Sequence, residues 1–87
     1  MSIPLTVQQL EACEHVLRAA GYSQAWLAPS DDFTETTFLV KENELDWVAP
    51  YESSAMNATV RKLAKELPGT KVYLLAYRRD VPVVALY

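Results

Sequence analysis

The sequence predicts an α+β domain in which a single antiparallel sheet of about five strands carries two helices on one face. Two segments, 5–22 and 54–67, place apolar residues at helical spacing between capping residues. The segments between them, and the final segment 71–87, are rich in the β-branched and aromatic residues that favour strands. We therefore expect the element order α-β-β-β-α-β-β in one domain spanning residues 1–87.

The first helix is expected within residues 5–22, LTVQQLEACEHVLRAAGY. Thr6 is a suitable N-cap, and Gln9 three residues later completes a capping box. Gly21 is suited to end the helix because it lacks a Cβ atom and adopts positive φ at little cost. The apolar stripe expected to face the core is Val7, Leu10, Cys13, Leu17 and Ala20.

Three strands and a second helix should follow. The strands are expected at 22–29 (YSQAWLAP), 33–40 (FTETTFLV) and 45–50 (LDWVAP). Ser53 or Ser54 should cap the second helix, which Pro68-Gly69 ends. Its expected apolar stripe is Met56, Val60, Leu63 and Leu67.

The last segment, KVYLLAYRRDVPVVALY, has the pattern of a β-hairpin with a turn at Arg79-Asp80. Apolar residues occupy both faces of both expected strands, whereas two helices cover only one face of a small sheet. We assign the face with the smaller residues to the helices. The face left open would carry Tyr73, Leu75, Tyr77, Pro82, Val84 and Leu86, with Trp26 or Trp47 joining it.

An open apolar face of this size is unusual in a monomer, which predicts that a partner covers it. Tyrosine and tryptophan suit such a surface because they combine an apolar body with a polar group. The alternative is that the sheet curls and its own loops fill the face. The predicted partner-binding residues are Tyr73, Leu75, Tyr77, Val84, Leu86 and Trp47.

The net charge of −3 conceals an uneven distribution. Residues 1–52 carry nine acidic and two basic residues, whereas residues 53–87 carry six basic and two acidic ones. This division favours electrostatic steering toward a basic partner, and the alternative is ordinary solvated surface. The residues expected to steer are Asp31, Asp32, Glu35, Glu42, Glu44 and Asp46.

The residues that usually carry catalysis or bind metals are scarce. His15 and Cys13 are the one histidine and the one cysteine, and they lie too far apart around a helix to form a catalytic pair. One of each cannot complete a structural zinc site, and two glycines cannot build a phosphate loop. We therefore predict no enzymatic activity, no metal and no cofactor.

The chain lacks the features of a membrane or secreted protein. No apolar run reaches the ~18 residues needed to span a bilayer. The N-terminal segment MSIPLTVQQLE has no signal-peptide pattern, and a single cysteine allows no intrachain disulfide. The chain is thus expected to be a complete, small cytoplasmic protein without membrane contact.

The leading functional hypothesis is a protein-binding domain, a small inhibitor or adaptor of the kind common among phage and mobile-element proteins, acting as a homodimer or on another macromolecule. The alternative is nucleic-acid binding through a basic patch of Arg61, Lys62, Lys65, Arg78 and Arg79. The first five expected elements resemble a double-stranded-RNA-binding domain in order, but Ser54 to Thr59 carry no charge where that module places its lysines. A third possibility is a small-ligand pocket between sheet and helices.

Overall fold

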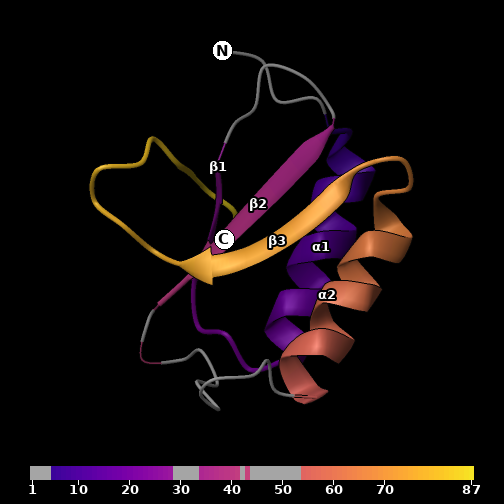
Figure 1. The fold of residues 1–87 in the computed structure, drawn as a ribbon, viewed down its shortest axis with the longest axis horizontal. Coiled ribbons are helices and arrows are strands. Elements are labelled where there is room, and N and C mark those ends of the chain that lie inside the picture. The colour runs from indigo at the N-terminus through magenta and orange to yellow at the C-terminus, as the bar shows by residue number, and fades with distance from the viewer. Residues whose placement is uncertain (1–4, 29–33, 42, 44–53) are drawn as a thin grey trace.

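The computed structural model describes residues 5–28, 34–41, 43 and 54–87, with the backbone alone for residues 54–57. Two helices and a four-stranded sheet form the described part, which confirms the α+β class (Figure 1). The elements in chain order are α1 (Val7–Ala19), β1 (Ala25–Ala28), β2 (Glu35–Val40), α2 (Ser54–Glu66), β3 (Lys71–Ala76) and β4 (Val84–Ala85). The strand expected at 45–50 lies outside the described residues.

The sheet is mixed, so the prediction of an antiparallel sheet is wrong. Its strand order is β3-β2-β1-β4. β1 is antiparallel to both β2 and β4, whereas β2 and β3 run parallel over six residue pairs from Glu35–Lys71 to Val40–Ala76. A parallel pair requires a long crossover connection, and α2 lies within this one.

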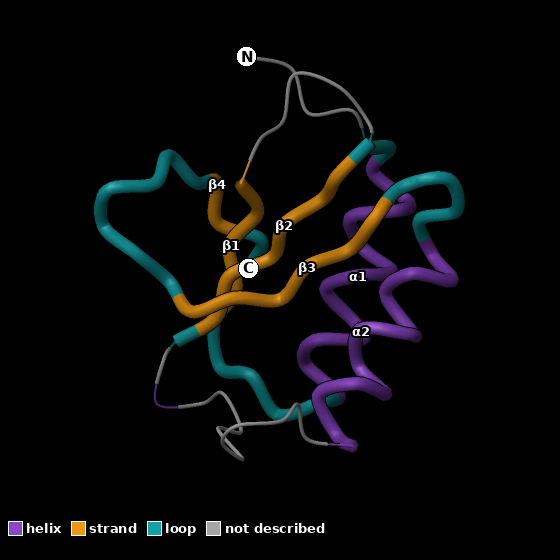
Figure 2. The backbone as a smooth tube through the Cα atoms, viewed as in Figure 1, coloured by secondary structure: helices purple, strands orange, loops and turns teal. Residues whose placement is uncertain are grey.

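The C-terminal hairpin predicted for residues 71–87 does not form. β3 and β4 lie at opposite edges of the sheet, and residues 77–83 carry the chain from one edge to the other (Figure 2). The Arg79-Asp80 pair is a weak hairpin signal compared with Asn-Gly. β4 pairs instead with β1, where the backbone N–H of Leu86 donates to the carbonyl of Ala25 at 2.8 Å.

The predicted start and end of α1 are confirmed. The backbone N–H of Gln9 donates to the Thr6 hydroxyl, and the backbone N–H of Thr6 donates to the Gln9 side chain. Gly21 adopts a φ of 95°, where a Cβ atom would cause strain. The predicted core stripe is right for Cys13 and Leu17 and wrong for Val7 and Ala20, which are exposed because they lie at the two ends of the helix.

Both helices pack on the same face of the sheet. Cys13 and Leu17 of α1 and Leu63 of α2 share one core with the strand residues Leu27, Phe38, Val40 and Leu74. Leu67, just after α2, is also fully buried there, and Val60 is half-buried, whereas the side chain of Met56 lies outside the described residues. None of the described helices is long and apolar enough to cross a membrane.

Tyr87 connects the C-terminal segment to α1 and the residues that follow it through a hydrogen bond and a cation–π contact. Its hydroxyl donates to the Tyr22 carbonyl at 2.7 Å. The Arg18 guanidinium lies 4.1 Å from the centre of its ring, and Arg18 also forms an ion pair with Glu14 at 3.1 Å. Because Tyr22 follows α1 directly, these contacts hold the end of the chain beside β1, far from the expected partner strand β3.

Candidate functional site

The sheet face opposite the helices is built from rows of paired residues. Residues paired across neighbouring strands point to the same face of a sheet. Trp26, Leu39 and Leu75 therefore form one row across β1, β2 and β3, and Ala28, Thr37 and Tyr73 form the next. We call this the open face, defined by Trp26, Ala28, Thr37, Leu39, Tyr73, Leu75 and, by alternation beyond Leu75, Tyr77.

An aromatic stack lies on the open face, near the C-terminal end of β3. The ring centroids of Trp26 and Tyr77 lie 4.2 Å apart with an interplanar angle of 27°. Trp26 comes from β1, while Tyr77 continues β3 and donates its backbone N–H to the Val40 carbonyl at 2.8 Å. The rings therefore meet across β2, whose Leu39 pairs with Trp26 and is only 2% exposed on a face without a helix.

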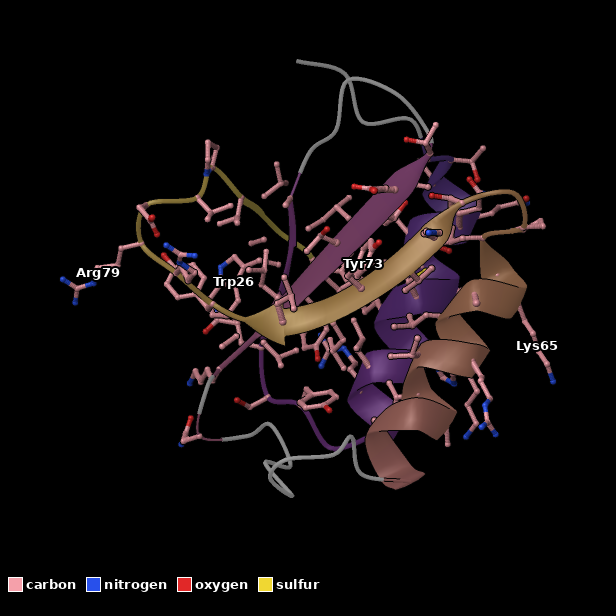
Figure 3. The ribbon with its side chains drawn as sticks, viewed as in Figure 1. Trp26, Lys65, Tyr73 and Arg79 are labelled. Atoms are coloured by element: carbon pink, nitrogen blue, oxygen red, sulfur yellow. The ribbon has the colours of Figure 1, made fainter. Side chains whose placement is uncertain are left out.

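Tyr73 and Leu75 lie exposed beside this stack. Leu75 is 51% exposed and Tyr73 is 38% exposed, both on β3 at the outer edge of the sheet (Figure 3). Tyr77 is also 38% exposed, although one side of its ring contacts Trp26. The structure thus places three of the six predicted partner-binding residues together on the open face, with Trp26 next to them.

The other three predicted partner-binding residues are not placed there. Val84 is paired with Leu27, so it belongs to the helix-facing side, and Leu86 packs against the core. The prediction placed them on the open face because it assumed pairing with β3, and pairing with β1 reverses their orientation. Trp47 lies outside the described residues.

Charged residues border the open face. Glu35 and Lys71, both exposed, are paired at the first residues of β2 and β3. Beyond Tyr77, Arg78 and Asp80 form an exposed ion pair at 2.8 Å. An apolar centre with a charged rim is the usual composition of a protein interface. Of the six residues predicted to steer, Glu35 alone is described; Asp31, Asp32, Glu42, Glu44 and Asp46 lie outside the described residues.

The structure does not bring the five predicted phosphate-binding cations together. Arg61, Lys62 and Lys65 are exposed on α2, whereas Arg78 and Arg79 belong to the segment between β3 and β4. Figure 3 shows Lys65 and Arg79 at opposite ends of the longest axis of the molecule. The basic surface is therefore divided, and Arg78 is already paired with Asp80.

Cys13 and His15 do not form a catalytic pair in the fold. The Cys13 side chain is fully buried, whereas His15 is exposed on the other side of α1. Burial, and secondarily the charge of Glu66, raises the pKa of the Cys13 thiol to about 11, which disfavours the reactive thiolate. Within the described ranges, no group of three or more histidine, cysteine, aspartate and glutamate side chains could hold a metal ion.

Sequence reasoning named Trp26 as a candidate for the open face but missed its stacking on Tyr77 and the burial of Leu39. Period-two alternation places Trp26 and Leu39 on one face of their strands, but strand order determines which side chains lie next to each other. Comparison with the known protein families, with curated proteins and with solved structures found no match to this chain.

Proposed function

We propose that this chain is a non-enzymatic protein-binding domain, a small inhibitor or adaptor, that binds its protein partner with the open face. The observation that carries the proposal is the exposure of Leu75 and Tyr73 next to the Trp26–Tyr77 stack. Aromatic side chains in a rigid setting make strong interface contacts because they bury large areas and lose little conformational freedom. The stacking of Trp26 on Tyr77 supports this because two rings already packed on each other have less conformational freedom to lose on binding.

The uneven charge of the chain supports a partner with a basic surface near its binding patch. The acidic residues Asp31, Asp32, Glu42, Glu44 and Asp46 all belong to the half of the sequence that carries nine acids and two bases. Charges at the rim of an interface generally change association rates more than they change the lifetime of a complex, and this is the role proposed for these residues. Neutralising Glu42, Glu44 and Asp46 should slow association at low salt and leave the dissociation rate nearly unchanged.

Capture of binding proteins from native lysate, quantified by mass spectrometry, tests the open face. The double variant Tyr73→Asp, Leu75→Asp places two charges on the face, and both sites are exposed enough to accept them without unfolding. Val7→Asp is the matched control, since Val7 is a 70% exposed apolar residue on α1, away from the sheet. We expect a protein that is retained by wild type and by Val7→Asp and lost with the double variant. Equal retention by all three chains would refute the open-face assignment.

Nucleic-acid binding remains the second candidate because Arg61, Lys62 and Lys65 are all exposed on α2. Phosphate contacts release counterions, so their affinity falls steeply as salt concentration rises. Binding of a labelled RNA or DNA duplex at low and at physiological salt, for wild type and for Lys62→Glu with Lys65→Glu, tests this candidate. Salt-sensitive binding that the α2 variant abolishes would favour it over the open face.

A further inference from the structure

The two edges of the sheet differ in length. β4 contributes two residues to one edge, whereas β3 forms the other edge with six residues, Lys71–Ala76. A strand at a sheet edge presents unpaired backbone donors and acceptors, with which another chain can pair. Proteins usually prevent such pairing with short edge strands, prolines or charges. β4 fits that pattern through its length and the preceding Pro82, but β3 contains no proline and one charged residue, Lys71.

Backbone hydrogen bonds show which groups of β3 face outward. The N–H of Lys71 donates to the Thr34 carbonyl at 2.9 Å, and the N–H of Tyr77 donates to the Val40 carbonyl at 2.8 Å. In a parallel pair, alternate residues bond to the same neighbour, so residues 71, 73, 75 and 77 bond to β2. Val72, Leu74 and Ala76 therefore direct their N–H and C=O groups away from the sheet, where no strand of the described chain pairs with them.

We propose that a second copy of this chain pairs with that edge, β3 against β3 in antiparallel orientation, with the two-fold axis at Leu74. This register lets all the outward groups bond, because Leu74 then faces Leu74 of the partner subunit and Val72 faces Ala76 of the partner subunit. The two four-stranded sheets join into one continuous sheet, and both helical layers lie on the same side of it.

The side chains of β3 are self-complementary in this register. On the open face, Tyr73 lies opposite Leu75 of the partner subunit, and Leu75 opposite Tyr73 of the partner subunit, so these side chains contact each other side by side while the outer surface of the face stays accessible. On the helix-facing side, the larger Val72 lies opposite the small Ala76 of the partner subunit. Lys71, the single charge of β3, lies opposite Tyr77 of the partner subunit, which avoids a like-charge contact and offers an aromatic ring to the ammonium group.

The chemistry of this edge favours a second copy over an unrelated strand. A foreign strand would need to match one cation, two large residues on the open face and the aliphatic residues Val72, Leu74 and Ala76 on the helix-facing side, and β3 itself supplies this arrangement in reverse. The proposal concerns the edge of the sheet and goes beyond the proposed function, which concerns its face. Dimerisation would place two open faces side by side and make them one larger binding surface.

Proline substitution at the outward positions tests the pairing. Ala76→Pro removes an outward N–H of β3 without breaking a bond to β2, and proline is tolerated at such positions. Ala85→Pro is the matched control because the Leu86 bond to Ala25 makes Ala85 an outward residue of the opposite edge. In sedimentation velocity at micromolar concentration, we expect dimers for wild type and Ala85→Pro and monomers for Ala76→Pro, with unchanged circular dichroism. Raising the salt concentration should not weaken the wild-type dimer.

Disulfide trapping tests the register. Residues 73 and 75 of the two copies form non-hydrogen-bonded pairs, whose Cα separation of about 4.5 Å suits a disulfide. The double variant Tyr73→Cys, Leu75→Cys should oxidise to a covalent dimer, whereas each single variant should not, and buried Cys13 should not interfere. A monomeric wild type, a dimer that survives Ala76→Pro, or efficient trapping of a single variant would overturn the proposal. None of these results would by itself refute partner binding by the open face. The Ala76→Pro chain keeps every residue of that face, so partner binding can be tested on the monomer.

Discussion

The indole of Trp26 stacks on the phenol ring of Tyr77 with 4.2 Å between ring centroids. The two residues are 51 positions apart in the sequence, and they come from the two opposite sides of β2. Leu39, which pairs with Trp26 on the same face, is only 2% exposed although no helix covers that side. The stack gives the second side of a thin sheet a small apolar cluster of its own, supplied by side chains of the sheet itself.

Removing the stack should destabilise the fold measurably. Trp26→Ala should lower the free energy of unfolding by about 2–3 kcal/mol, below the 3–5 kcal/mol typical of a fully buried aromatic residue, because Trp26 is half-buried. Urea unfolding of Trp26→Ala, Tyr77→Ala and the double variant should give a coupling of about 0.5–1.5 kcal/mol. Strictly additive effects would show that the rings contribute independently. Tyr73→Ala is the comparison, since Tyr73 is exposed and no ring contact to it is recorded among the described residues.

The hydroxyl of Tyr87 should contribute to stability through its hydrogen bond to the Tyr22 carbonyl. Tyr87→Phe removes the donor to the Tyr22 carbonyl and keeps the ring beneath Arg18. We expect a loss of about 0.5–1.5 kcal/mol in the free energy of unfolding, measured by urea titration. Arg18→Ala should lower the free energy of unfolding as well, because it removes the cation from the Tyr87 ring and the ion pair with Glu14. A Tyr87→Phe chain as stable as wild type would mean that water satisfies the Tyr22 carbonyl equally well.

The stability of the fold should fall at alkaline pH because of Cys13. Its thiol pKa is about 11 in the folded chain, against 9.0 for an ordinary thiol, so the folded state holds the proton longer than the unfolded state. Stability is therefore complete below pH 9 and decreases as pH rises toward 11, by about 2–3 kcal/mol at most. Lysine and tyrosine titrate in the same range, so the measurement is the difference between wild type and Cys13→Ala in urea midpoints from pH 8 to 11. That difference should narrow as pH rises, and a constant difference would contradict the prediction.

The capping box of α1 should be worth about 1 kcal/mol. Thr6→Ala removes the hydroxyl that accepts from the Gln9 backbone N–H at 3.1 Å and leaves the first turn with an unsatisfied donor. Thermal unfolding followed by circular dichroism should show a lower midpoint for Thr6→Ala and a nearly unchanged one for Thr6→Ser, which retains the acceptor. Equal midpoints for all three chains would mean that water replaces the cap without cost.

Local chemistry was sufficient to predict part of this structure. Thr6, Gln9 and Gly21 set the limits of α1 through hydrogen bonds and dihedral angles that involve neighbouring residues only. The alternation of β3 likewise places Tyr73 and Leu75 on the face opposite Val72 and Leu74, because the period of two is a property of any strand. These features carry the candidate binding residues on β3, and they hold whichever strand lies beside it.

Strand pairing was decided by the tertiary structure alone. Residues 84–85 could pair with the nearby β3 or with the distant β1, and the choice depends on contacts that no local pattern contains. Pairing with β1 allows Leu86 to reach the core and Tyr87 to contact Tyr22 and Arg18, while the α2 crossover aligns β3 with β2 in parallel. The sequence by itself therefore determined the ends of α1 and the alternation of side chains along β3. The free energy of contacts between distant segments determined the order of the described strands, and with it the Trp26–Tyr77 stack and the position of β3 at one edge.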